Sequence, residues 1–247
     1  GAAAGVYSPL SSAVAAASVS EERRGRALGL VLAGLAMGTV FGVPLGLLLG
    51  GLTSWRGRIL LITIVGALAL IGIFSSWGRE LPGVDAPSLV ARLRSIGSGP
   101  NLMTVTVTLF TGIASLGLYT YIASLLGDTG LASHPTAGIW AWGVGGAVGV
   151  MLIGRLVDRV GDSLRVTAVI LALLTIVLVV LGTGPAVWLL AAALFAWGAL
   201  GWSSLAPQQD TLLATNPRDG ATAVAANASA NYLGSAIGSA LGAGVLA

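Results

Sequence analysis

The sequence contains no cysteine and only one histidine, His134, among its 247 residues. The absence of cysteine excludes disulfide bonds and thiolate metal sites. The phosphate-binding pattern Gly-Lys-Ser/Thr is also missing, so nothing in the sequence indicates a nucleotide site. We therefore expect no metal and no cofactor.

Charge is scarce as well. Charged residues make up 9% of the chain and hydrophobic residues 55%, and the mean hydropathy is +0.93. A soluble domain has about 25% charged residues, so this chain has too little charge to cover a surface that faces water. Its net charge of +3 comes from arginines in short segments between apolar runs. That placement indicates membrane topology and argues against a nucleic-acid partner.

Apolar runs of about 17 to 25 residues predict membrane-spanning helices. We expect eight, and hence an all-α polytopic membrane protein that is a piece of a longer chain. A partial span ends near Ala17 and the last begins near Ala221. The six between them are predicted at residues 27–53, 59–77, 102–126, 136–154, 166–182 and 185–206.

The arginines alternate between the two sides of this predicted bundle. Only Arg56 and Arg58 fall on one side, and the other loops with arginine fall on the opposite side. Arginine-rich loops stay in the cytoplasm, which orients the chain in a cell membrane. Residues 79–100 form the longest internal loop and contain three prolines. We expect a linker there, between the end of one helical bundle (1–78) and a second bundle (101–247).

Glycines recur every four residues in two of the predicted spans. Gly34, Gly38, Gly42 and Gly46 form one stripe, with Pro44 among them, and a shift of 196 residues brings Gly38, Gly42 and Gly46 onto Gly234, Gly238 and Gly242. Small residues at this spacing allow two helices to approach closely in lipid, and proline kinks a helix. The stripes favour two bundles that rock against each other; the alternative is static close packing.

Four stretches resemble the major facilitator superfamily, most closely its twelve-helix drug:proton antiporters and the branch of arabinose and other sugar-efflux permeases. They are residues 21–27 (EERRGRA), residues 38–46 with their glycines and Pro44, residues 119–122 (YTYI) and residues 154–161 (GRLVDRVG). The resemblance extends over the whole chain and implies a fragment from late helix 4 to most of helix 11. It also implies transport by alternating access.

The stretch Gly154, Arg155, Asp158, Arg159 and Gly161 lies at a cytoplasmic helix end in this arrangement. We interpret it as a gate, in which Asp158 holds a helix N-terminus or an arginine across the cytoplasmic mouth. The alternative is a solvated loop that supplies positive charge for topology.

Polar and aromatic residues inside spans are candidates for the substrate path. Asn227 and Asn231 are four residues apart and share a helix face. Tyr119 and Tyr121 are two apart, so at most one of them faces a cavity. Trp197 lies deep in its span. Each of the five has a structural alternative in helix packing or in the interfacial belt. Gln208 is expected to belong to a polar helix terminus.

The predicted function is export of a small organic solute by a monomeric secondary transporter in the cell membrane, with protons as the coupling ion. No charged residue lies inside a predicted span. A proton-coupled carrier needs an embedded carboxylate, which would then lie outside this sequence, and a facilitator without coupling is the alternative. An intramembrane enzyme and an ion channel are remote alternatives, because the sequence shows neither a set of catalytic residues nor a selectivity-filter segment.

Overall fold

The structure is a computed structural model that describes residues 55–75, 97, 99–127, 129–216 and 220–246, together with residues 11, 14, 15, 18, 19, 34, 38 and 42. These residues form helices and short turns, with no strand among them. The all-α fold expected from the sequence is confirmed. The chain divides into two units, one made of Ser11–Val84 and the other of Asp85–Ala247 with Gly1–Leu10. Each unit is considered by itself.

Helix α4 (Trp55–Ser75) is the long described element of the first unit. It coincides with the predicted span at residues 59–77. Large apolar side chains are exposed around it, among them Ile62 at 72% and Ile71 at 64%. A helix that is apolar on all sides is suited to lipid or to burial within a larger bundle.

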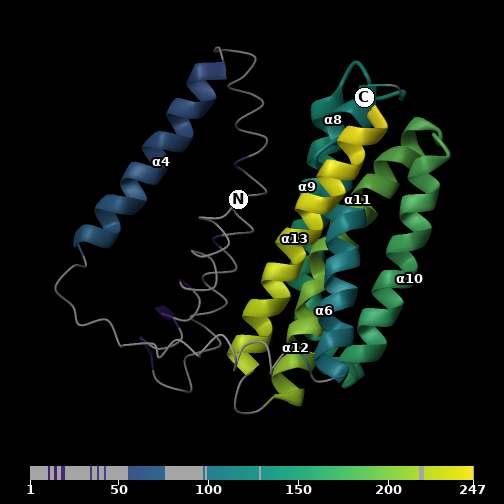
Figure 1. Cartoon of the computed structure of the whole chain (residues 1–247). Helices are drawn as coiled ribbons and strands as arrows, with labels where there is room; N and C mark the ends of the chain where they lie inside the picture. Colours follow the sequence, from purple (N-terminus) through teal and green to yellow (C-terminus); the bar gives the residue numbers. More distant parts are fainter. Residues whose placement is uncertain are drawn as a thin grey trace. The chain divides into compact units, whose positions relative to one another are not determined.

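The described residues of the second unit form a bundle of five helical rods (Figure 1). The first rod contains α6 (Gly99–Thr111), the π-helix η3 (Gly112–Leu116), α7 (Gly117–Tyr119) and α8 (Ile122–Gly127). The others are α9 (Pro135–Val160), α10 (Ser163–Gly182), α11 (Val187–Ser203) continued by α12 (Leu205–Thr215), and α13 (Gly220–Leu246).

Four segments of this bundle are long and apolar enough to cross a membrane, namely Gly99–Tyr119, Pro135–Val160, Ser163–Gly182 and Val187–Thr215. Helix α13 is 27 residues long but is not among them. Its alanine, glycine, serine and asparagine residues give it a lower hydropathy, as suits a helix that packs mainly against other helices.

The turn between α9 and α10 is set by two residues. Gly161 adopts the left-handed conformation, with φ of 66°, and its amide donates to the carbonyl of Val157 at 2.9 Å. Asp162 then caps α10, because its carboxylate accepts from the backbone amide of Arg165 at 3.0 Å. A glycine C-cap followed directly by an aspartate N-cap produces a tight helical hairpin.

Glycines bring two pairs of rods into backbone contact. A Cβ atom built on Gly145 would collide with the carbonyl oxygen of Phe195, and one on Gly198 with that of Trp142, so α9 and α11 touch directly. A Cβ on Gly112 would lie 2.6 Å from the carbonyl oxygen of Asn231, and one on Gly117 would lie 2.5 Å from the Cα of Gly238. The first rod therefore lies against α13 in the same way, which is the packing that small residues permit in membranes.

Candidate functional site

A line of polar side chains runs along the buried face of the first rod. Asn101, Thr104, Thr108 and Ser115 are all buried, with exposed fractions between 0 and 7%. They are separated by three, four and seven residues, which places them on one face of the helix. The threonines bond within the helix, as in Thr104, whose hydroxyl donates to the carbonyl of Pro100 at 3.0 Å. This rod thus presents polar groups to the centre of an apolar bundle.

Three of the five rods meet at Thr108. Its hydroxyl lies within hydrogen-bond distance of Gln208 Oε1 on α12, 2.5 Å from Asn227 Oδ1 on α13 and 3.1 Å from the carbonyl oxygen of Thr104 in its own helix. All three side chains are at most 1% exposed. A hydroxyl has one proton and can donate to only one of these oxygens at a time. The Nδ2 atom of Asn227 has no partner within the described residues, so this cluster retains unused hydrogen-bonding capacity.

An aromatic cluster lies farther along the first rod, against α9 and α11. The rings of Tyr119 and Trp142 stack, with centroids 4.1 Å apart. Trp197 and Trp202 each form an edge-on pair with Trp142, with ring centroids 6.0 and 6.1 Å from its centroid. These offset and edge-on geometries are favourable for aromatic pairs. Trp142 Nε1 is buried without a partner among the described residues.

Ser115 links the first rod to this aromatic cluster. Its hydroxyl accepts from the indole nitrogen of Trp197 at 2.8 Å. Ser115 is seven residues from Thr108, or about 10 Å along the helix. The polar cluster, which involves α12 and α13, and the aromatic cluster, which involves α9 and α11, therefore follow one another along the first rod. We call them together the inner seam, which consists of Thr108, Ser115, Tyr119, Trp142, Trp197, Trp202, Gln208 and Asn227.

The structure brings three of the five predicted path residues into the inner seam. Tyr119 is half-buried there, and Trp197 and Asn227 are fully buried. Tyr121 points away from it, since its hydroxyl donates to the carbonyl of Ser239 on α13. Asn231 is half-buried at the contact of α13 with the first rod. The two tyrosines diverge, as their spacing predicted.

One expectation near this site was wrong. Gln208 does not belong to a polar helix terminus; it is 1% exposed, and its helix continues to Thr215. Its amide nitrogen donates to the carbonyl of Ser204 at 2.9 Å, and its oxygen faces Thr108. Thr108 and Ser115 were not singled out from the sequence, although their spacing on one helix face was a usable signal.

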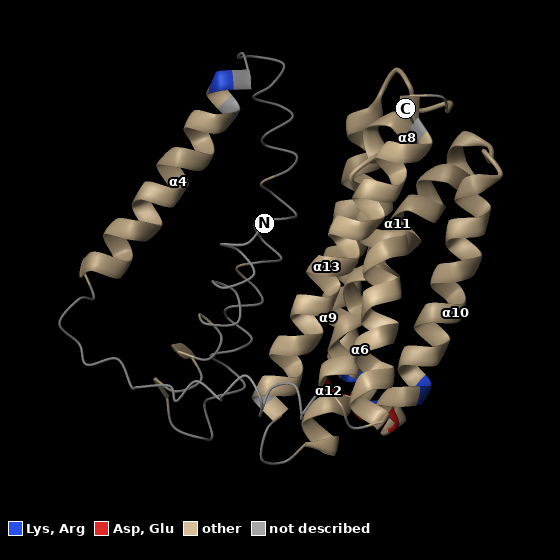
Figure 2. Cartoon of the chain, viewed as in Figure 1, with Lys and Arg blue, Asp and Glu red and all other residues tan. Residues whose placement is uncertain are grey.

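The charged residues of the described bundle gather at one end (Figure 2). They lie on the last turns of α9, in the hairpin, on the first turn of α10 and on α12, and are Arg155, Asp158, Arg159, Asp162, Arg165 and Asp210. Of the predicted gate residues, Arg155, Asp158 and Arg159 are exposed and make no salt bridge within the described part of the chain. Gly154 is exposed there too, and Gly161 forms the left-handed cap. The gate role stays a prediction.

The predicted glycine stripes are described only in part. Gly234 and Gly238 lie against the backbone of the first rod, and Gly242 faces the ring of Tyr121. These contacts are inside one bundle and provide close packing. Gly34, Gly38 and Gly42 have no described atom within 4 Å of an added Cβ. Pro44 and Gly46 lie outside the described residues.

Comparison with known proteins decides the family. A sequence model of the Major Facilitator Superfamily matches residues 1–239. The chain belongs to this superfamily. The superfamily relatives include the inner membrane transport protein YdhP of Escherichia coli, which is 27% identical over 246 residues, or 98% of the chain and 62% of the relative.

Two further superfamily relatives carry functional names. A probable sugar efflux transporter of Mannheimia succiniciproducens is 32% identical over 210 residues, covering 83% of the chain and 52% of the relative. A chloramphenicol resistance protein of Streptomyces lividans is 30% identical over 150 residues, covering 59% of the chain and 38% of the relative. The chain spans about half the length of the curated relatives that it matches.

Membership of the superfamily, together with four helices able to cross a membrane, makes this a multi-pass membrane protein. The resemblance noted from the sequence is confirmed at the level of the superfamily.

Proposed function

We propose that the protein containing this chain exports a small organic solute by alternating access, with the inner seam forming part of the substrate path. The observation that carries the proposal is the seam itself. It places aromatic rings and unused amide and indole N–H groups in the centre of a bundle from a superfamily member. Binding sites for small molecules combine apolar and aromatic walls with a few polar groups in this way.

The chemistry of the inner seam favours an uncharged or weakly charged solute. No charged side chain belongs to the seam, and its polar groups are hydroxyl, amide and indole. Sugars and aromatic amphiphiles both bind through ring faces and neutral hydrogen bonds. The names of the two relatives, one for sugar efflux and one for chloramphenicol resistance, agree with that class.

The path residues are proposed to become accessible when the bundles move. Trp197 and Asn227 are 0% exposed in the described arrangement, so a solute reaches them only after the helices separate. Tyr119 and Trp202 are half-buried and are the seam residues that a solute would meet first. Tyr121 and Asn231 remain candidates at the edge of the path, on the side of α13.

The movement is proposed to involve the glycine stripes and the gate stretch. Gly38, Gly42 and Pro44 would let the first bundle (1–78) pivot against the second (101–247), joined by the linker at residues 79–100. Asp158 would latch the mouth on the arginine-bearing side. That side is assigned to the cytoplasm, in agreement with the positive-inside rule. The transporter itself is proposed to be a monomer in the cell membrane.

Proton antiport is the proposed driving mechanism, and a facilitator is the alternative. Every acidic residue described in the bundle, Asp158, Asp162 and Asp210, lies at its charged end. A carboxylate that exchanges protons within the membrane would therefore lie outside the described residues.

Transport by the full-length protein in liposomes tests this proposal. Vesicles are loaded with radiolabelled chloramphenicol or arabinose, and a pH gradient is imposed. We expect an acidic exterior to drive efflux beyond equilibrium and a protonophore to abolish that effect. Efflux that only equilibrates the solute and ignores the gradient would establish the facilitator. Failure to move either solute, in protein that remains folded, would contradict the proposed substrate class.

A further inference from the structure

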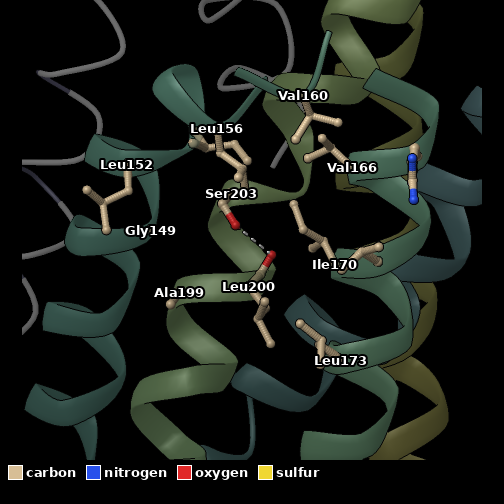
Figure 3. Close-up of a pocket in the computed structure, with 13 residues that line it drawn as sticks. Gly149, Leu152, Leu156, Val160, Val166, Ile170, Leu173, Ala199, Leu200 and Ser203 are labelled. Carbon is tan, nitrogen blue, oxygen red and sulfur yellow. Dashed lines mark hydrogen bonds between the residues drawn. The ribbon is translucent and has the colours of Figure 1, made fainter. Parts of the chain in front are cut away.

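A long apolar groove opens between α9, α10 and α11 on the bundle, with a cavity volume of about 620 Å³ (Figure 3). Leu152 and Leu156 of α9 form one wall, and Ile170 and Leu173 of α10 form the other. Ala199 and Leu200 of α11 form its floor. The groove is separate from the inner seam, because none of its lining residues belongs to the seam.

The groove offers few hydrogen-bonding groups to an occupant among its described lining residues, and one of them is cationic. Arg165 and Ser203 are its only polar lining side chains. The Ser203 hydroxyl donates its proton to the carbonyl of Leu200 in its own helix, at 3.3 Å. Arg165 stands near Val160, at the charged end of the bundle, and is exposed. The groove is thus hydrocarbon-like along its length, with one arginine side chain at its end.

The arginines at this end are not held in ion pairs by the nearby acids of the described residues. Arg159 and Arg165 make no salt bridge within the described part of the chain. The carboxylate of Asp162 caps α10, and that of Asp210 accepts from the Ser163 hydroxyl at 2.5 Å. Asp158 follows Leu156 by two residues and therefore faces roughly the opposite side of α9.

The dimensions of the groove match one leaflet of a bilayer. Its α9 wall extends from Val160 to Gly149, a separation of eleven residue steps and about 16 Å along the helix. Half of a hydrocarbon core of about 30 Å is about 15 Å. The groove therefore extends from the level of the headgroups, where arginines are expected, to about the membrane midplane.

We propose that this groove binds an anionic glycerophospholipid, with an acyl chain along the apolar walls and the phosphate at Arg165. Guanidinium groups pair well with phosphate, and basic pockets at a membrane surface recognise anionic headgroups. A peptide segment would leave the arginines without an anionic partner unless it carried an acid. The inference depends on membership of a membrane family and not on the proposed transport activity.

Native mass spectrometry of the delipidated full-length protein tests the headgroup half of this proposal. The probes are phosphatidylglycerol and, with identical acyl chains, zwitterionic phosphatidylcholine. We expect one phosphatidylglycerol to bind more tightly than phosphatidylcholine. Arg165→Gln should weaken phosphatidylglycerol binding about fivefold. Arg155→Gln removes the same charge from a residue that does not line the groove and should have a much smaller effect. Equal binding of the two lipids, or unchanged binding after Arg165→Gln, would overturn the proposal.

A pair of tryptophan substitutions on α10 tests the acyl-chain half. Val169 lines the groove and is 53% exposed, whereas Val179 lies outside it and is 63% exposed. Val169→Trp should fill the groove and remove the tight phosphatidylglycerol site, and Val179→Trp should leave it intact. Equal binding by both variants would show headgroup attraction without an occupied groove and would reject the site. If another segment of the full protein covers the groove, the parent will show no preference for phosphatidylglycerol, and Val169→Trp will lower its melting temperature.

Discussion

The Thr108 hydroxyl is the point where α6, α12 and α13 are joined by side chains. It stands between two amide oxygens, those of Gln208 and Asn227, and has one proton to donate. Rotating the Asn227 amide by 180° would turn its unpartnered Nδ2 toward Thr108 and make it a second donor. Thr108 therefore accommodates either amide orientation, and a cluster of this kind can change its pairing when a polar solute arrives.

Thr108→Val keeps the shape of the side chain and removes the hydroxyl. Two buried amides would then lose their shared partner, at a cost of about 1–3 kcal/mol in the free energy of unfolding. SDS titration or thermal melting in detergent measures this change.

Thr175→Val is the matched control for this prediction. The Thr175 hydroxyl is exposed and donates only to the carbonyl of Leu171 in its own helix, at 2.8 Å. Its loss should alter stability by no more than about 0.5 kcal/mol. Equal effects of the two substitutions would contradict a joining role for Thr108.

At the scale of the helical element, two glycines on α9 provide a close comparison. Gly145 packs against the backbone of Phe195, whereas an added Cβ at Gly143 would meet no described atom within 4 Å. Gly145→Ala should force α9 and α11 apart and destabilise the bundle by about 1–3 kcal/mol. Gly143→Ala, two residues away, should be neutral or stabilising by up to about 1 kcal/mol, since alanine favours helix. Unfolding curves of the two variants in detergent measure the difference, and similar curves would rule out backbone contact between these rods.

The helices of the bundle were predictable from hydropathy, but their ends on the charged side were not. The predicted span at residues 136–154 stopped before Arg155, yet α9 continues to Val160. The span at 185–206 stopped before Gln208, yet α12 continues to Thr215. In both cases a polar residue suggested that the apolar run had ended, and the helix itself persisted. Helix α9 ends at the left-handed Gly161, and helix α12 ends at Asn216.

The inner seam was predictable only in part for a different reason. Trp197 and Asn227 were candidates because a tryptophan and an amide deep in a span are unusual. Their partners Ser115 and Thr108 are small residues of a kind common in membrane helices, and they are 82 and 119 residues away in the sequence. Which helix faces which, and at what register, depends on the glycine contacts, and a single sequence does not give those pairings.

At the scale of the whole molecule, the bundle has a charged end and an uncharged interior within its described residues (Figure 2). A conformational change can therefore be controlled electrostatically at that end without placing a charge in the membrane. Asp158 is the acid best placed for such control, because it is exposed, lacks a described salt bridge, and is not used as a cap. If it latches the two bundles together, its partner lies across the mouth.

Asp158→Asn should release this latch and favour the conformation open at the charged end. Loss of one partly exposed ion pair, about 1 kcal/mol, would change the ratio of the two states about fivefold. Cysteines introduced by Leu102→Cys, near the charged end of the first rod, and Ser124→Cys, near its other end, report the two openings. This chain has no native cysteine that would also react with the label. Asp158→Asn should raise the labelling rate at residue 102 and lower it at residue 124.

Asp162→Asn separates a latch from a general loss of negative charge. It removes the same charge four residues away, while asparagine still caps α10 because it is as good an N-cap as aspartate. We expect its labelling pattern to match that of the parent protein. If Asp158→Asn and Asp162→Asn shift the labelling equally, the effect comes from net charge at this end. If neither shifts it, Asp158 is a solvated loop residue and the two bundles are held closed by packing alone.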